Sequence, residues 1–584
     1  MAEVVGRHLA DQGSWDTAFR SETLVVLHNG TTPAWRVYSL HRAAGVVLGT
    51  LFGHSENSGG NGPLPCIGEA DSERIRASEG RYLLEGFWGR YVALLELPAG
   101  AGTRILRDPT GAVPCFVLRF GDVQVACSHV DDAARLGLLE PRIDWDHVVA
   151  YLHFNHMVTS HTGLAGVRQV QAGECVTLAS DESPSSEYYW TPGLVYRQRE
   201  RRDRQSAMCA LRSVIQRCVS SWGRSYGSIL HQLSGGLDSA IVLACLHRCQ
   251  PSPYIVCENH YTPAAMGDER AFARLAARNA CAELIELPIK PPAEPITRMF
   301  EPRLVASPTL VAFVPETATA RRHVIEERRI EAVFSGQGGD HFFQGVRTPL
   351  IAADYARCTG IRKELLGVMS DTARLTRRSV WSVLGSVIGH GLLRWPYDPY
   401  DALRPSPLLS PSARGAIDAC CIRHPWIDTA SDLPACKRLQ VFNIIDTQNF
   451  YRIPADRADI VHPLIAQPVI ELCLQIPSYD LSYGGIDRAL VREAFAGLVA
   501  PEILSRTQKG ATTGYFSALL IRSLVTVREF LLNGLLIAEG VLDRRQTESA
   551  LQEPSLLRRP EQIPSVLDAI TAEFWVRGWT SQAR

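Results

Sequence analysis

The sequence predicts a two-part α/β protein, in which a β-rich N-terminal domain precedes a mostly parallel sheet with covering helices and a helical extension. Two observations predict this arrangement. Between residues 23 and 190, short β-branched and aromatic runs are separated by Gly, Pro and Asp turn signals. Between residues 228 and 334, apolar strand patterns alternate with amphipathic helix patterns, which is typical of βαβ units and a parallel sheet.

Each expected element has its own pattern. In the first part the strand runs are residues 23–29, 35–41, 45–53, 91–98, 103–108, 115–120 and 123–128. In the second part the expected strands are residues 228–233, 254–259, 283–289 and 331–334, and the expected helices are 206–219, 238–247, 268–280 and 316–328. Beyond residue 345 the pattern is mostly helical. Because parallel sheets bind ligands at the carboxyl ends of their strands, the chemistry is expected there.

Composition places the chain among ordinary globular proteins. Its 584 residues are 46% apolar and 21% charged, which suffices for large cores and exceeds the ~100–200 residues of a single domain. Lys plus Arg is 60 and Asp plus Glu is 61, so the formal net charge is −1. No global field draws such a chain to nucleic acid or to an anionic membrane, and we predict neither as a partner.

The cysteines and the N-terminus favour a reduced, cytoplasmic protein. The 15 cysteines are an odd number and lack the paired C-x-x-C spacing of zinc sites and dithiol redox centres. The first dozen residues carry charges and no apolar segment of the secretory kind. The longest uncharged apolar stretch, residues 379–393, is short for a membrane span of ~18–20 residues.

A glycine-rich turn follows the first strand of the second part. The hexapeptide Ser234-Gly235-Gly236-Leu237-Asp238-Ser239 leads directly from that strand into a helix. Two glycines let the backbone turn sharply, so that successive N–H groups converge at a helix N-terminus, where an anion is stabilised. The G-x-x-x-x-G-K-[ST] arrangement of kinases and GTPases is missing. The pattern predicts a phosphate-binding loop of another kind.

A second glycine-rich turn ends the last expected strand. It reads Ser335-Gly336-Gln337-Gly338-Gly339-Asp340, followed by His341. Such a turn offers a second backbone approach to a nucleotide, and its aspartate offers an oxygen ligand of the kind that Mg²⁺ prefers.

The two loops carry a resemblance. SGGLDS resembles the signature of the ATP pyrophosphatase family, and SGQGGD resembles the SGxGxDExF element of the asparagine synthetase family. The resemblance implies that ATP is a substrate cleaved between its α and β phosphates, and that Mg²⁺ is held by Asp238 and Asp340. It also implies that ATP and pyrophosphate contact the first loop, through Ser234, Gly235, Gly236, Leu237, Asp238 and Ser239, and the second loop, through Gly336, Gly338 and Gly339. The glutamate usual after the second aspartate is His341 here, which departs from asparagine synthetases.

The N-terminal part resembles a class II glutamine amidotransferase domain. The similar segments are residues 86–93, 107–114 and 171–173. Such domains use a cysteine exposed as residue 1 after methionine removal, with its own amine as base. Here the second residue is Ala2 and the first cysteine is Cys66. We therefore expect a degenerate amidotransferase-like β-sandwich over residues 1–192, a linker over 193–205, and an ATP pyrophosphatase domain of the adenine nucleotide α-hydrolase-like kind over 206–584.

The C-terminal part resembles a narrower group. Residues 459–477 carry HPL-x-x-QP in place of RxPFLD, and together with GQGGDHFF this is similar to lasso peptide cyclases, which are macrolactam synthetases related to β-lactam synthetases. The resemblance implies adenylation of an Asp or Glu side chain in a leader-free core peptide, followed by attack of the peptide's N-terminal amine, with release of AMP and pyrophosphate. The implied partners are the core peptide, a leader peptidase and a precursor-recognition protein.

The resemblance also suggests catalytic residues. Lys509 matches a lysine that approaches the acyl-adenylate in lactam-forming relatives, where a fixed cation offsets developing negative charge. Asp459 aligns with the glutamate that helps deprotonate the amine in β-lactam synthetases, with Tyr451 as its partner; alternatively, Asp459 caps a helix. Asp268 and Glu269 match an acidic pair of the family or stabilise a helix N-terminus.

Three alternatives to a lasso cyclase stay open at this point. An ammonia-dependent asparagine synthetase would make asparagine from aspartate, ATP and ammonium. A β-lactam synthetase would turn over a carboxyethyl amino acid without any peptide. A non-catalytic scaffold with a degenerate synthetase fold would release no pyrophosphate.

Overall fold

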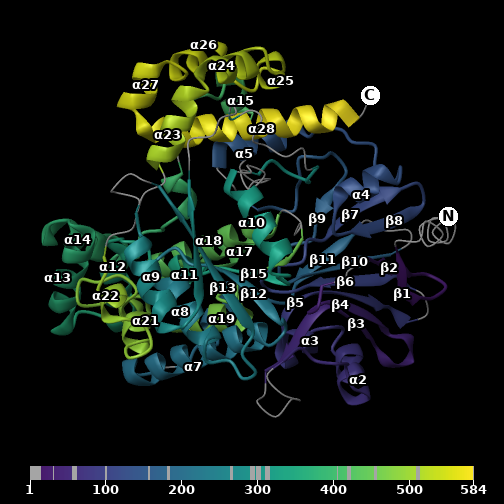
Figure 1. Ribbon diagram of the computed structural model, residues 1–584, viewed down its shortest axis with the longest axis horizontal. Helices are drawn as coiled ribbons and strands as arrows, with labels where there is room; N and C mark the ends of the chain where they lie inside the picture. Colours follow the sequence, from purple (N-terminus) through teal and green to yellow (C-terminus); the bar gives the residue numbers. More distant parts are fainter. Residues whose placement is uncertain are drawn as a thin grey trace.

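The protein has a mixed α/β fold built around two large sheets that lie side by side (Figure 1). The computed structural model describes residues 15–29, 32–54, 62–98, 101–154, 158–179, 184–200, 202–262, 268–289, 296, 304–309, 316–403, 405–416, 423–452, 457–507 and 513–582. Within these ranges no helix combines the length and the apolarity needed to cross a membrane.

The first unit consists of antiparallel strands. Its main sheet has the order β11-β10-β6-β5-β4-β3, beside a three-stranded sheet β8-β7-β9 and a hairpin β1-β2. The strand bounds are β1 Asp16–Arg20, β2 Val25–His28, β3 Arg36–Ser39, β4 Gly45–Gly53, β5 Phe87–Glu96, β6 Thr103–Arg107, β7 Phe116–Phe120, β8 Val123–Cys127, β9 Arg168–Gln169, β10 Glu174–Leu178 and β11 Ser185–Tyr188. The seven strand runs expected from the sequence are confirmed.

Strand β5 is buried along nearly its whole length because both of its faces are covered. Tyr91 and Ala93 point into a core that continues into the second unit. Val92 and Leu94 point the other way, into a separate core shared with the β1-β2 hairpin and β7. The alternation along β5 therefore joins two layers of the first unit to the rest of the molecule.

The second unit contains five parallel strands in the order β14-β13-β12-β15-β16. Their bounds are β12 Ser228–Gln232, β13 Tyr254–Tyr261, β14 Glu283–Pro288, β15 Ala332–Phe334 and β16 Asp459–Val461. The first four confirm the expected strands. Strand β16 was missed, because the sequence pattern around it, after residue 345, is mostly helical. It pairs with β15 in parallel register.

Helices cover both sheets. In the first half of the chain they are α2 Glu69–Ala77, α3 Tyr82–Gly86, α4 Val130–Arg135, α5 Trp145–Phe154, α6 Pro192–Arg197, α7 Arg204–Gly223, α8 Leu237–Leu246 and α9 Arg270–Asn279. Next come α10 Glu316–Glu327, α11 Gly339–Phe342, α12 Leu350–Thr359, α13 Glu364–Thr376, α14 Val380–Ser386, the π-helical η5 Val387–Leu392, α15 Pro411–Gly415, α17 Pro425–Thr429 and α18 Ala435–Thr447. The rest are α19 Gln467–Gln475, α20 Ser478–Leu481, α21 Ala489–Ala494, α22 Pro501–Leu504, α23 Thr513–Arg522, α24 Leu524–Leu532, α25 Leu535–Ala538, α26 Arg544–Ala550, α27 Glu553–Arg558 and α28 Ile563–Gln582.

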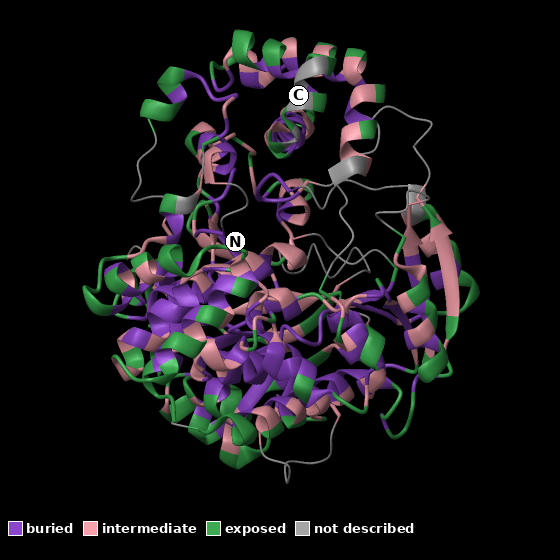
Figure 2. Ribbon diagram, turned by 90° about the vertical axis from the view of Figure 1, so that its left-hand side faces the viewer, coloured by how far each residue is buried: buried purple, intermediate pink, exposed green. Residues whose placement is uncertain are grey.

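The last helices return to the first unit. Figure 1 shows the long helix α28 crossing above α5, and the two helices share one apolar core with β7. The indole N–H groups of Trp575 and Trp579 both donate to the carbonyl of Val305, at 2.7 and 3.0 Å. A continuous band of buried residues runs through the sheets below this helical layer (Figure 2).

A buried ion pair joins the two large sheets. Arg90 of β5 binds both carboxylate oxygens of Asp459, the first residue of β16. Tyr226 donates a hydrogen bond to the same carboxylate at 2.6 Å. Burial raises the pKa of Asp459, but Arg90 and the hydrogen bonds from Arg90 and Tyr226 lower it more, so the net pKa lies below the ordinary carboxyl value.

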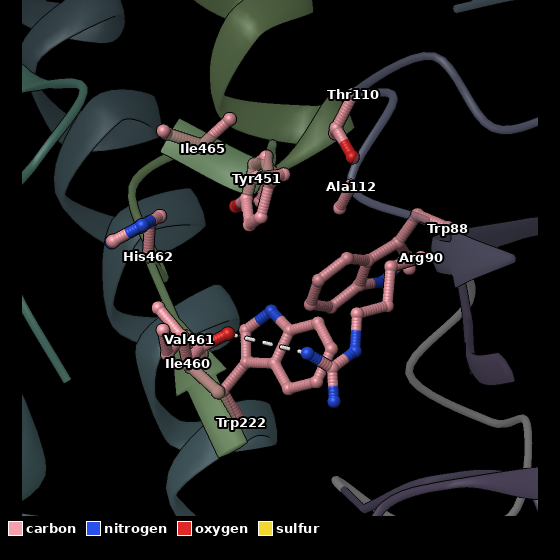
Figure 3. Close-up of a pocket in the computed structure, with 12 residues that line it drawn as sticks. Trp88, Arg90, Thr110, Ala112, Trp222, Tyr451, Ile460, Val461, His462 and Ile465 are labelled. Atoms are coloured by element: carbon pink, nitrogen blue, oxygen red, sulfur yellow. Dashed lines mark hydrogen bonds between the residues drawn. The ribbon is translucent and has the colours of Figure 1, made fainter. Parts of the chain in front are cut away.

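Aromatic side chains close the interface around this pair. Phe52 stacks on Trp88 at 4.5 Å between ring centroids and meets Trp222 of α7 edge-on at 4.9 Å. Figure 3 shows Arg90 between Trp88 and Trp222, with its hydrogen bond to the backbone carbonyl of Ile460. The remaining cavity has a volume of about 10 Å³, which is room for about one water molecule.

We predict that Arg90→Met lowers the free energy of unfolding by about 3–5 kcal/mol, because it leaves the Asp459 carboxylate buried without its cation. Adding Asp459→Asn should recover part of this loss. Urea unfolding measures both variants. Arg81→Met is the matched control, since Arg81 pairs with Glu187 at the surface, where an ion pair contributes ~1 kcal/mol or less.

The same pair predicts a pH dependence. A carboxyl whose pKa is lowered on folding contributes stability above its unfolded pKa, near 3.8, and loses that contribution as the pH falls through its folded pKa. The difference in stability between wild type and Arg90→Met should therefore shrink below about pH 4. A difference that is small at neutral pH, or no larger than that of Arg81→Met, would contradict the assignment.

Candidate active site

Two loops meet at the point where the strand order of the parallel sheet reverses. From β12 the chain adds β13 and β14 on one side and later β15 and β16 on the other. In parallel sheets, ligands bind at the carboxyl ends of the strands beside such a reversal, so the loops after β12 and β15 are the expected ligand site. These loops are the two glycine-rich turns identified in the sequence.

The first loop is held in shape by its own side chains. Gly235 has φ 82°, a backbone conformation that favours glycine. The hydroxyl oxygens of Ser234 and Ser239 lie 3.2 Å apart, and the amide of Gly236 donates to Ser234 Oγ at 3.2 Å. Below them, His231 Nε2 lies 2.9 Å from the carbonyl oxygen of Ser239. Burial lowers the pKa of His231 to about 4, so this support is uncharged at neutral pH.

The second loop packs directly against the first. A Cβ added at Gly336 would lie 2.5 Å from the amide nitrogen of Ser239. A Cβ added at Gly339 would lie 2.2 Å from the carboxylate carbon of Asp238. No side chain fits in either place, and Gly338 between them has φ 98°. The glycines are thus required by close approach of the loops, and that approach places Asp340 beside Asp238.

The two predicted metal ligands converge on one cation. Arg488 Nη1 donates to Asp238 Oδ2 at 2.9 Å and to Asp340 Oδ1 at 2.5 Å. The Asp238 side chain is 12% exposed and that of Asp340 is 41% exposed. The Asp238 carboxylate is therefore largely buried, whereas the Asp340 carboxylate is accessible to a ligand.

Arg488 was not singled out in the sequence as a site residue. It begins α21 with φ 53°, and Asp487 beside it is bound by Arg347 and Arg492. Burial lowers the pKa of Arg488, but Asp238, Asp340 and Asp487 raise it more, so the group stays charged. A lone arginine after Gly-Gly-Ile-Asp gives no sequence signal of this role, because only the fold brings it to the two aspartates.

A second arginine holds the first loop from outside. Arg506 donates to the carbonyl of Gly235 at 3.1 Å and binds the carboxylate of Glu269. Asp268 instead pairs with Arg270 at 2.6 Å, at the start of α9. The acidic pair noted in the sequence is thus split: Glu269 supports the loop, and Asp268 supports the helix start.

The residues present fit a magnesium ion. One oxygen of Asp238 and one of Asp340 already bind the Arg488 guanidinium. In proteins, Mg²⁺ is usually held by one or two carboxylates together with substrate phosphates. In the described part of the chain, no three His, Cys, Asp or Glu side chains form a metal cage. A bound Mg²⁺ would therefore need oxygens from the nucleotide, and it would neutralise phosphate charge.

The predicted catalytic residues lie in different places. Asp459 forms an ion pair with Arg90 at the sheet interface. Tyr451 lines the small cavity beside Arg90 (Figure 3). Burial raises the pKa of Tyr451 well above its ordinary value. Lys509 lies outside the described residues. The structure thus places both Tyr451 and Asp459 near Arg90 at the sheet interface, and a catalytic role for either stays a prediction.

Two histidines complete the site region. The Nδ1 atom of His462 lies 2.7 Å from Ser335 Oγ, and Ser335 Oγ accepts from the amide of Gln337 at 3.2 Å. Burial lowers the pKa of His462 to about 4. His341 packs edge-on against Phe450. The residues that depart from asparagine synthetases therefore support the second loop and its surroundings.

Comparison with known proteins identifies the family. Residues 210–577 match the model of the asparagine synthase family, which is more than half of the chain, so the protein belongs to this family. Membership indicates an enzyme that uses ATP to form an amide bond. No curated protein matches the sequence significantly.

Two solved structures are similar to about half of the chain, at low identity and low TM-score. One is titled structure of the allosteric regulatory enzyme of purine biosynthesis, with 12% identity and a TM-score of 0.18 over 51% of this chain and 71% of that one. Another is glutamine phosphoribosylpyrophosphate amidotransferase from B. subtilis in complex with ADP and GMP, with 11% identity and a TM-score of 0.17 over the same shares. TM-scores this low carry no argument about the fold or the function.

We predict that Gly339→Ala destabilises the protein by about 1–3 kcal/mol, because a methyl group there overlaps the Asp238 carboxylate and forces the loops apart. It should also abolish ATP-dependent pyrophosphate release. Gly367→Ala in α13 is the matched control, since a Cβ there meets nothing within 4 Å and should stabilise the helix by ~0.4–1 kcal/mol. Equal unfolding free energies for the two variants would contradict the close approach.

We predict that Arg488→Gln tightens Mn²⁺ binding in the absence of ATP by at least about 10-fold, because it removes a positive charge from the two carboxylates that would hold the metal. Isothermal titration of the nucleotide-free protein measures this affinity. Arg347→Gln is the matched control, since Arg347 binds Asp487 without touching either metal ligand. An unchanged Mn²⁺ affinity in Arg488→Gln would show that the metal binds elsewhere.

Proposed function

We propose that this protein is a lasso peptide cyclase, an ATP-dependent macrolactam synthetase. It adenylates an Asp or Glu side-chain carboxylate of a leader-free core peptide, and the N-terminal amine of that peptide then closes an isopeptide ring. The observation that carries the proposal is the pair of glycine loops with Asp238 and Asp340 at the switch point of the parallel sheet. The narrower assignment rests on the likeness of residues 459–477 and of GQGGDHFF to lasso cyclases.

The proposed first step uses the loops as an anion site. A substrate carboxylate oxygen attacks the α-phosphorus of ATP, the bond from that phosphorus to the bridging β-oxygen breaks, and pyrophosphate leaves. Backbone N–H groups at the start of α8 donate to the pyrophosphate oxygens and stabilise their negative charge. When bound at Asp238 and Asp340, Mg²⁺ supplies further neutralisation of the phosphates.

The proposed second step transfers the acyl group. The neutral N-terminal amine attacks the acyl carbon and loses one proton to solvent, the amide C–N bond forms, and AMP leaves with the carboxylate oxygen it acquired. Lys509 is proposed to offset charge on the tetrahedral oxygen and the phosphate. Holding the ring-forming ends together is the main task, because positioning can supply ~7–11 kcal/mol of a barrier.

The source of the nitrogen is proposed to be the peptide. A glutamine-dependent ligase must move ammonia from the first unit to the second, and the sheet interface is filled by the Arg90–Asp459 pair and its aromatic neighbours. Burial raises the pKa of Cys115 to about 11, and it also raises that of Cys175. Neither of these thiols is an activated nucleophile.

We predict that a linear core peptide and ATP yield a product lighter by one water, together with AMP and pyrophosphate. Mass spectrometry follows the peptide and a coupled assay follows pyrophosphate. Asp340→Asn and Lys509→Ala should lower the rate by at least ~100-fold, because each removes charge stabilisation of the reacting phosphates or acyl group. Asp401→Asn is the control, since Asp401 is an exposed carboxylate of the second unit outside the two loops.

The same assay separates the alternatives. Asparagine formed from aspartate and ammonium would identify an ammonia-dependent synthetase, and turnover of a carboxyethyl amino acid would identify a β-lactam synthetase. Pyrophosphate release with no substrate of these three classes would leave only the general ligase chemistry of the family. Cyclisation that survives Asp340→Asn would remove the role proposed for that residue.

A further inference from the structure

The helix formed by α14 and η5 exposes large apolar side chains. Trp381 is 80% exposed, and Leu393 and Trp395 at the other end are 60% and 57% exposed. Ile388 and Leu392 between them are also exposed. Trp381, Gly385, Ile388 and Leu392 are spaced by four, three and four residues, which places them in one row along the helix.

The opposite side of this helix is apolar as well. Val383 and Val387 are fully buried against α12 and α13. Gly391 lies so close to α12 that an added Cβ would sit 2.9 Å from the carbonyl oxygen of Ala353. A surface helix of a globular protein normally carries polar residues outward. Here the stretch from residue 379 to 393 contains no Asp, Glu, Lys or Arg at all.

Basic residues stand at both ends of the apolar row. Arg377 and Arg378 precede it and Arg394 follows it, and all three are exposed. None of them has a carboxylate partner among the residues that the structure describes. Across residues 361–395 the sequence has six basic residues, Arg362, Lys363, Arg374, Arg377, Arg378 and Arg394, against two acidic ones, Glu364 and Asp371. This excess is local, because the whole chain has a net charge of −1.

We propose that this face, Trp381 to Trp395 with its flanking arginines, binds the surface of an anionic membrane. A helix with apolar side chains outward and basic residues at its ends lies in the plane of a bilayer interface, with Trp at headgroup level and Arg on anionic lipids. The segment is too short to span a bilayer, in keeping with lying flat. Figure 1 shows α13 and α14 at the outer edge of the molecule, away from the first unit, where a flat surface can reach them.

The composition of the row favours lipid over a protein partner. Protein interfaces carry about one hydrogen bond per 100–200 Å², whereas the large apolar side chains of this face offer only the indole N–H groups of Trp381 and Trp395. The sequence predicted no membrane partner, because it was assessed only for net charge and for whether residues 379–393 are long enough to span a bilayer. The exposed row and its arginines become visible only when the burial of each side chain is known.

Flotation of the full-length protein with vesicles tests the proposal. We expect binding to vesicles of 30% phosphatidylglycerol in phosphatidylcholine, little binding to pure phosphatidylcholine, and weaker binding as salt is raised. Trp381→Ser with Leu393→Ser should raise the half-saturating lipid concentration by at least 10-fold. Arg377→Gly with Arg394→Gly should also weaken binding to the anionic vesicles, because it removes positive charge. Glycine is suited to both positions, since Arg377 and Arg394 have φ 54°.

The matched control is Val525→Ser, which changes another strongly exposed apolar side chain, 72% exposed on α24. It should bind vesicles like the wild type. Equal binding of wild type and Trp381→Ser/Leu393→Ser would overturn the proposal. So would absence of vesicle binding together with a dimer that the same substitutions dissociate, since the face would then be an interface between copies of this chain.

Discussion

The candidate site depends on holding two carboxylates, Asp238 and Asp340, close enough to share one cation. Like charges at this distance repel strongly in a partly buried place, so the pair persists only with a positive group between its members. Arg488 is that group, since its guanidinium donates to both carboxylates. The surrounding architecture serves this one requirement, from the glycines that let the loops touch to the arginines that fix Asp487 beneath Arg488.

The arrangement would also suit a bound metal. Under the proposed function, Mg²⁺ held by Asp238 and Asp340 would take over the role of the Arg488 guanidinium in balancing the two carboxylates, and Arg488 would then be available to the phosphates of ATP. The interface between the sheets supports the two glycine loops, because Arg90 of β5 pairs with Asp459 of β16, the strand beside β15. The strands that carry the two glycine loops, β12 and β15, are thus connected through β16 to the sheet of the first unit.

Much of the fold could be predicted from the sequence because its elements are locally coded. Four strands of the parallel sheet, and the helices that follow them, have strong patterns, and SGGLDS and SGQGGD mark their own loops. Strand β16 was not predicted, since its three residues lie in a mostly helical part of the sequence and pair with β15, which is more than one hundred residues earlier in the chain. Arg488 and Arg506 were missed for a related reason: each reaches its partners across more than one hundred residues of chain. The likeness of residues 459–477 to related enzymes suggested a catalytic role for Asp459, but it could not reveal that Asp459 pairs with Arg90.

The central claim is that the site activates a carboxylate by joining it to the α-phosphorus of ATP. The most direct measurement labels both oxygens of the reacting Asp or Glu side-chain carboxylate of the linear peptide with ¹⁸O and locates the label after cyclisation. The account predicts one ¹⁸O atom in the phosphate of AMP and none in pyrophosphate, because the carboxylate oxygen that attacks phosphorus leaves with AMP. Label in inorganic phosphate, with ADP as the nucleotide product, would mean activation by the γ-phosphate and would contradict the roles assigned to both glycine loops.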